Sequence, residues 1–258
     1  MTGYKIPIFK RGSILTQEML EAMKQYMVDV TAAGFLEYSD GIICGLKTEV
    51  SDGILTIGGG LVKYNDTILV LDGSESVPIL EKNELQFVKL SITDKEIGTD
   101  FECVNVHLII DSDTEKKNNE IEICRMQVQN GARLRNDYRS LEDMGTAYDT
   151  LQLIHADYAG YKEPGIHPQI LEQFAKELRE SSRKGPEDIC FLQQIYGMQG
   201  RSLNRGLIEF YLSEKRKGKA SGYTNEEIYK GLCSILRQQK NGVPERSQIR
   251  EPRRMIVD

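Results

Sequence analysis

The sequence predicts an α+β fold: an N-terminal helix plus an antiparallel β-sandwich or barrel domain, followed by a small α-helical bundle domain. Two observations carry this prediction. Between Ile42 and Val128, short apolar runs with a period near two alternate with turns rich in glycine and aspartate. After residue 145 the apolar period becomes helical. The 258 residues are enough for one large domain or two ordinary ones.

Residues 16–33 are predicted to form the first helix. Thr16 is suited to cap its amino terminus, because a threonine hydroxyl can accept a hydrogen bond from a free backbone N–H of the first turn. Apolar residues then recur at spacings of three and four, which places them on one helix face. They are Met19, Leu20, Met23, Met27 and Val30.

The strand-forming region follows this helix. Its first part contains the apolar runs 42–46, 54–57, 60–64 and 67–71, separated by turn residues. Three longer strands are predicted over 85–93, 102–110 and 120–128. In the last of these, the alternation of apolar residues shifts at Cys124, which predicts a β-bulge.

The carboxy-terminal half has helical periodicity. Candidate helices cover 147–159, 167–182, 186–198, 202–216 and 224–239. The last begins with Thr224 and Glu227 at the spacing of a capping box. We therefore predict three regions, namely an assembly domain of helix and strands (1–145), an α-helical bundle domain (146–240) and an extended basic tail (241–258).

Charge is distributed unevenly along the chain. The net charge is −6 overall. Residues 1–145 contain 15 Lys and Arg against 24 Asp and Glu, whereas residues 201–254 contain 13 against 6. An acidic first half and a basic end favour two domains with different partners, or a contact between the halves of neighbouring copies.

Composition excludes several classes of protein. Mean hydropathy is −0.41, and no run approaches the roughly 18 apolar residues of a membrane span. The amino terminus has no apolar segment typical of a secretory signal, and the five cysteines form no C-x-x-C pair. We therefore expect cytoplasmic synthesis and free thiols.

No pattern indicates catalysis. A P-loop is absent, and the glycines of 58–60 lie between two strand-like runs, so they are expected to form a turn or bulge. The carboxylates between Asp111 and Glu122 imitate a calcium loop but have Lys116 where its turn requires glycine. His107, His155 and His167 belong to no metal motif. We therefore expect that the protein is not an enzyme and that it has no catalytic residue, no cofactor and no metal.

A basic cluster near the carboxy terminus is a candidate interface. Its members are Lys215, Arg216, Lys217, Lys219, Arg246, Arg250, Arg253 and Arg254. We expect it to bind an acidic protein surface, because no aromatic residues for base stacking alternate with these arginines. The alternative is a cytosolic binding module that contacts nucleic acid through this region.

The segment from Phe9 to Leu71 resembles a known family. A short helix precedes a pattern of glycine turns and apolar strand positions, formed here by Gly41, Gly45, Leu46, Val50, Gly53, Leu55, Ile57, Gly60 and Leu61. This pattern resembles the amino-terminal domain of phage tail-fibre, baseplate and receptor-binding-adaptor proteins, including subunits of phage-tail-like contractile injection machines. Those fibres continue into a repetitive shaft, whereas this chain continues with helices. A baseplate component or fibre adaptor is therefore favoured over a receptor-binding fibre.

The resemblance implies a structural subunit that acts by protein–protein assembly. Its implied partners are further copies of itself, with a trimer as one expected form, and other tail or baseplate subunits within a virion or phage-tail-like particle. Met19, Met23 and Met27 are the expected contacts in the first helix, because methionine adapts to irregular apolar surfaces. Nucleic acid is not an expected partner.

Overall fold

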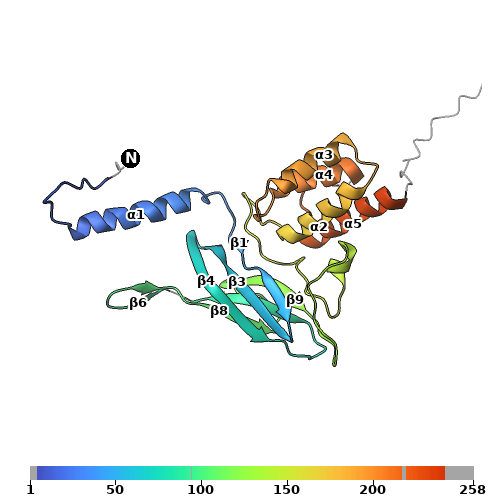
Figure 1. The fold of residues 1–258 in the computed structure, drawn as a ribbon, viewed down its shortest axis with the longest axis horizontal. Helices are drawn as coiled ribbons and strands as arrows, with labels where there is room; N and C mark the ends of the chain where they lie inside the picture. Colours follow the sequence, from blue (N-terminus) through green and yellow to red (C-terminus); the bar gives the residue numbers. More distant parts are fainter. Residues whose placement is uncertain (1–4, 94, 217–218, 242–258) are drawn as a thin grey trace, which may run out of the picture.

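The computed structural model describes residues 5–93, 95–216 and 219–241. It confirms the predicted fold class, with an N-terminal helix, a β-rich domain and carboxy-terminal helices (Figure 1). The first elements are α1 (Gln17–Ala33), β1 (Gly41–Gly45), β2 (Thr48–Ser51), β3 (Ile54–Tyr64) and β4 (Thr67–Pro78). There follow β5 (Gln86–Ile92), β6 (Glu96–Ile97), β7 (Glu102–Cys103), β8 (Val106–Asp111) and β9 (Glu120–Met126). The remainder is the short 3-10 helix η1 (Glu142–Gly145), then α2 (Pro168–Glu180), α3 (Pro186–Tyr196), α4 (Arg205–Arg216) and α5 (Asn225–Asn241).

The β domain is a sandwich of two antiparallel sheets. In the first sheet the long strand β3 is central, with β1 and β2 along one side and β4 along the other. The second sheet has the order β8-β5-β9, and β6 and β7 form a separate hairpin. The described strands form no closed barrel. The inner faces bury Leu55, Val88 and Ile123.

Turns and one irregularity fix the register of these strands. β3 and β4 are joined by Asn65 and Asp66, both with positive φ, as a two-residue hairpin turn requires. Between β5 and β9, Val88 pairs with Cys124 and Lys89 pairs with Glu122, so Ile123 is an extra residue in β9. This confirms the bulge predicted from the shift in alternation.

Helices α2 to α5 form the bundle. The predicted capping box is present at α5, where Thr224 N donates to Glu227 Oε2 at 2.7 Å and Glu227 N donates to Thr224 Oγ1 at 3.2 Å. Aromatic rings hold α3 against α4, because Phe191 stacks on Tyr211 with ring centroids 4.0 Å apart. Over the described part of the chain the bundle has four helices where five were expected, because residues 147–159 form no helix.

The prediction of a helix over 147–159 is wrong. This segment contains no helix, and its backbone bonds instead to the edges of two strands. Gln152 and Arg125 of β9 exchange two hydrogen bonds, at 2.8 and 2.9 Å. Ile42 of β1 donates to Asp157 O at 2.7 Å and accepts from Ala159 N at 2.9 Å. Backbone partners supplied by distant strands thus override the local helical pattern.

The bundle is attached to the turn that precedes this segment. Tyr229 of α5 donates to Leu141 O at 2.7 Å, and Leu141 N donates to Glu177 of α2 at 2.5 Å. Arg237 forms an ion pair with Glu142 at 2.5 Å. Buried side chains of the sandwich and of the bundle belong to one continuous apolar cluster.

The division into domains 1–145 and 146–240 stays a prediction, which two fragments can test. We expect a fragment of residues 1–165 to unfold cooperatively, and at higher temperature than a fragment of residues 1–145. The reason is that 149–159 supplies backbone partners for β1 and β9 and buries Leu151 and Leu153. Circular dichroism melting curves measure the difference. Equal melting temperatures would show that this segment does not stabilise the sandwich.

Candidate assembly interface

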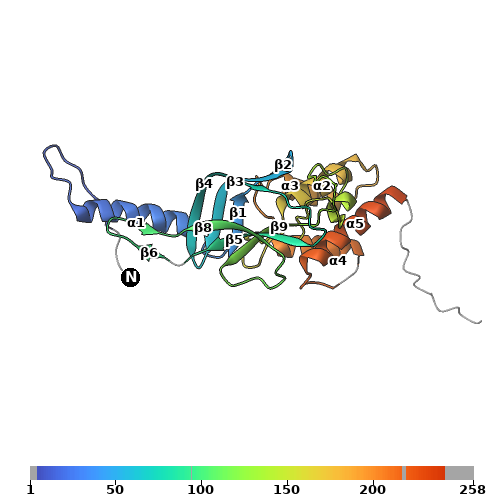
Figure 2. The same ribbon diagram turned by 90° about the horizontal axis from the view of Figure 1, so that it is seen from below.

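Helix α1 projects from the sandwich at the end opposite to the bundle (Figures 1 and 2). Thr16 caps it as predicted, accepting from Met19 N at 3.3 Å. Its contacts with the rest of the molecule include β4, yet none of its residues is buried. A helix of this length is marginally stable without tertiary packing. The exposed helix is therefore suited to packing against a partner chain.

Residues 5–36, here called the amino-terminal arm, expose an unusual number of large apolar side chains. The most exposed is Ile14, and Met27 of α1 is 64% exposed. Extended apolar surface of this kind typically marks an interaction site. The exposed side chains include Ile6, Ile8, Phe9, Ile14, Leu15, Leu20, Met23, Met27, Val28, Val30 and Leu36.

The three predicted methionines differ in their surroundings. Met19 is half-buried, whereas Met23 and Met27 are exposed. Leu20 and Val30 are also exposed and belong to the same predicted face. The stripe that sequence periodicity placed on one helix face is therefore largely open to solvent.

Sequence reasoning missed the contribution of two other segments. Ile6 and Ile8 precede the predicted helix and are 76% and 71% exposed. Ile97 and Phe101 of the β6–β7 hairpin are exposed as well, at the end of the molecule from which α1 projects (Figures 1 and 2). The sequence signal for these two segments is that their apolar residues fit neither a helical nor a strand pattern, which indicates that they are not needed for the core of the fold.

Two members of the predicted basic cluster are engaged in ion pairs within the chain. Lys215 Nζ lies 2.9 Å from Asp188 Oδ2, and Lys219 Nζ lies 2.9 Å from Glu227 Oε2. Arg216 is exposed and has no ion pair within the described residues. The other members, Lys217, Arg246, Arg250, Arg253 and Arg254, lie outside the part of the chain that the structure describes.

Asp188 is a fully buried carboxylate in the first turn of α3. Besides Lys215, it accepts hydrogen bonds from Tyr211 Oη at 2.6 Å and from Gly185 N at 2.8 Å. Burial and the bond to Asp188 raise the pKa of Tyr211. Lys215 thus compensates a buried charge, which makes it a structural residue of the bundle.

The histidines have structural surroundings. Burial lowers the pKa of His167 to about 3, so its ring is neutral and Nδ1 accepts from Gln169 N at the start of α2. Burial also lowers the pKa of His155. His107 is exposed. No group of three or more His, Cys, Asp or Glu side chains suited to a metal occurs within the described residues.

The carboxylates that imitate a calcium loop have other partners. Asp111 and Glu120 both contact the buried Lys89 Nζ, at 3.0 and 3.2 Å. Glu122 forms an ion pair with Arg125 at 2.5 Å. Asp111, Glu120 and Glu122 are therefore engaged in ion pairs within the chain.

No described helix combines the length and apolar character needed to cross a bilayer. No protein-family model matches the sequence, and no curated protein matches it significantly. Similar solved structures include TssK, with 10% identity over 94% of this chain and 70% of that chain at a TM-score of 0.40. A chain of the type VI secretion system TssK–TssF–TssG baseplate subcomplex has 9% identity over 92% of this chain and 99% of that chain, at a TM-score of 0.38. A chain of the baseplate complex from the type VI secretion system has 9% identity over 91% of this chain and 100% of that chain, at a TM-score of 0.34.

Proposed function

We propose that the protein is a structural component of a phage tail or phage-tail-like contractile injection particle, in the role of a baseplate or fibre-adaptor subunit. After synthesis in the cytoplasm it enters the particle by protein–protein contacts. The observation that carries the proposal is the amino-terminal arm, because a helix with no buried residue and many exposed apolar side chains is suited to packing in an assembly.

The sequence of the arm and of the first sheet supports the particular kind of assembly. The resemblance to phage tail and baseplate proteins covers Phe9 to Leu71, which runs from the arm into β4. Two glycines of this pattern, Gly45 and Gly60, lie opposite each other where β1 and β3 approach closely. A Cβ on Gly45 would lie 2.5 Å from Gly59 O, and one on Gly60 would lie 2.5 Å from Cys44 O. The pattern therefore corresponds to a real constraint on this sheet.

The expected partners follow from the two ends of the molecule. The arm is suited to bind further copies of the chain, with other tail or baseplate subunits as additional partners. Lys215 and Lys219 already pair with carboxylates, which leaves Arg216 as the unpaired member of the predicted basic cluster within the described residues. This favours a protein partner over nucleic acid for that cluster. The carboxy-terminal arginines stay a predicted contact for an acidic protein surface.

Isolation of particles tests the function. We expect the affinity-tagged chain, expressed in its native cell, to sediment with particles that contain tube and sheath proteins, and immunogold electron microscopy to label one end of them. Proteins of the sedimented fraction are identified by mass spectrometry, and a tagged cytosolic protein of similar mass is the control. Recovery of the chain only in the low-mass fraction of cells that contain intact particles would contradict the proposal.

A further inference from the structure

The two sheets of the sandwich meet along two seams, and one of them is closed by the chain itself. At this seam the segment 149–159 runs between the edges of β9 and β1. It exchanges backbone hydrogen bonds with Arg125 and Ile42, and Asp157 N also donates to Glu122 O at 2.8 Å. An extended segment thus provides hydrogen-bond partners for the backbone groups of two strand edges, and it covers the apolar interior between them.

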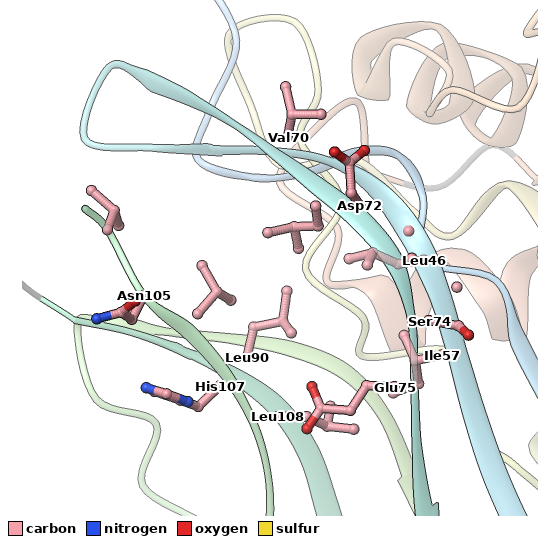
Figure 3. A pocket seen from close by; sticks show the side chains of 16 residues that line it. Leu46, Ile57, Val70, Asp72, Ser74, Glu75, Leu90, Asn105, His107 and Leu108 are labelled. Carbon is pink, nitrogen blue, oxygen red and sulfur yellow. The ribbon is translucent and has the colours of Figure 1, made fainter. Parts of the chain in front are cut away.

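The opposite seam, between β4 and β8, is open. It contains a cavity of about 430 Å³ between the two sheets (Figure 3). Leu46, Ile57 and Leu90 line its apolar floor, while Val70 of β4 is exposed at its rim. The floor of this cavity is apolar, so it is suited to the apolar side chains of a bound segment.

Both strands at this seam have a free edge. Neither β4 nor β8 has a second neighbour among the described strands. Ile79 N donates to Gly53 O, so these two residues form a hydrogen-bonded pair. Hydrogen-bonded and non-hydrogen-bonded pairs alternate along an antiparallel ladder. The backbone N–H and C=O groups of Ser74 and Ser76 therefore point away from β3, toward the free edge of β4. The bond from Thr93 N to Asn105 O likewise turns the backbone of Val106 away from β5. Free edges of this kind readily accept another strand.

We propose that the open seam binds residues 5–9 from a second copy of this chain, added as a strand along the free edge of β4. The inference rests on the self-association included in the proposed function. It specifies the donor, the acceptor and the type of contact. Main-chain hydrogen bonds then provide affinity, and alternate side chains enter the cavity.

The donor segment has the required pattern. Ile6 and Ile8 alternate with Pro7, so both isoleucines point to the same face of an extended strand and reach the cavity floor. Their backbone groups are the ones that pair with β4. Pro7 lacks an N–H, and in this register its nitrogen points away from β4, where no donor is needed.

Charge also favours this pairing. Asp72 and Glu75 of β4 line the cavity, as Figure 3 shows. Lys5 stands at one end of the donor segment, and Lys10 and Arg11 follow its other end. Opposite charges at the rim of a contact assist docking and fix its orientation.

The geometry of the arm assigns the donor to a different copy. The 17 residues of α1 extend for about 25 Å. Residues 5–9 fold back beside the helix end that is distal to the sandwich, where Lys5 Nζ lies 3.0 Å from Glu18 Oε1 (Figures 1 and 2). A segment held at this distance is presented to a neighbouring molecule. When each copy donates to the next, the contact is head-to-tail, and it forms a ring where the rotation between successive copies closes after a whole number of copies.

Disulfide cross-linking between two variants tests the contact. Both carry Cys103→Ser and Cys190→Ser, which remove the exposed native thiols. One also carries Phe9→Cys, which faces the same outer side as the exposed Val70 when Ile6 and Ile8 face the cavity. The other carries Val70→Cys and a size tag, and the mixture is oxidised at low oxidant concentration. We expect a heterodimer that is reversed by reductant, at no less than ten times the yield of a matched mixture in which Ile189→Cys replaces Val70→Cys. Ile189 is also exposed but lies on α3.

A second variant removes the side chains that would enter the cavity. Ile6→Asp with Ile8→Asp is expected to lower self-association measured by analytical ultracentrifugation about tenfold or more, whereas Ile189→Asp leaves it unchanged. The inference would be overturned if the cross-link yield equalled that of the control. It would also be overturned if, in isolated particles, Val70→Cys formed a disulfide only with a different protein of the particle. Because particle sedimentation is measured separately, the proposed function stands if only the cross-link fails.

Discussion

Replacing Asp188 with alanine is expected to lower the free energy of unfolding by about 3–5 kcal/mol, the range typical of breaking a buried ion pair. Asp188 is fully buried and Lys215 Nζ lies 2.9 Å from it, with a side chain that is 19% exposed. Removal of the carboxylate leaves this ammonium group partly buried without its partner. It also removes the acceptor of the Tyr211 hydroxyl. The loss of stability is expected to be largest in the helical bundle.

Chemical denaturation monitored by circular dichroism measures this effect. The control is Glu187→Ala, which removes the neighbouring exposed carboxylate, 3.5 Å from the same Lys215 Nζ, and is expected to change stability by no more than about 0.5 kcal/mol. Asp188→Asn is expected to lie between the two, because an amide oxygen can still accept from Tyr211. A change below 1 kcal/mol for Asp188→Ala would contradict the assignment of Lys215 to the bundle.

Replacing Met23 and Met27 together with glutamate is expected to reduce self-association, and incorporation into particles, by tenfold or more. Both side chains are exposed in the isolated chain, so its melting temperature is expected to stay nearly unchanged. In an assembly that covers α1, two charges would be buried without partners, which is strongly unfavourable. Analytical ultracentrifugation and quantitative mass spectrometry of isolated particles measure the two effects.

The matched control places the same charges on another part of the same helix. Gln17→Glu with Gln25→Glu adds two carboxylates at exposed polar positions of α1. We expect this control to assemble like the unaltered chain. Incorporation of the methionine variant at the normal level, with its fold intact, would show that this face of α1 is not an interface.

Local sequence patterns determined much of the fold. Alternation of apolar residues predicted the strands, and its shift near Cys124 located the bulge at Ile123. Thr16 and Thr224 cap α1 and α5 as predicted. These features depend on neighbouring residues and on the period of the backbone, so they can be derived without knowledge of the tertiary structure.

Tertiary structure decided the features that depend on distant partners. The segment 147–159 has an apolar pattern compatible with a helix, yet the edges of β1 and β9 provide its backbone partners. Charge counting placed Lys215 on a binding surface, whereas the buried Asp188 holds it inside the bundle. The periodicity of α1 predicted an apolar stripe but not that Met27 is exposed. A sequence specifies which groups need a partner, and only the folded chain determines which partner is near enough to satisfy them.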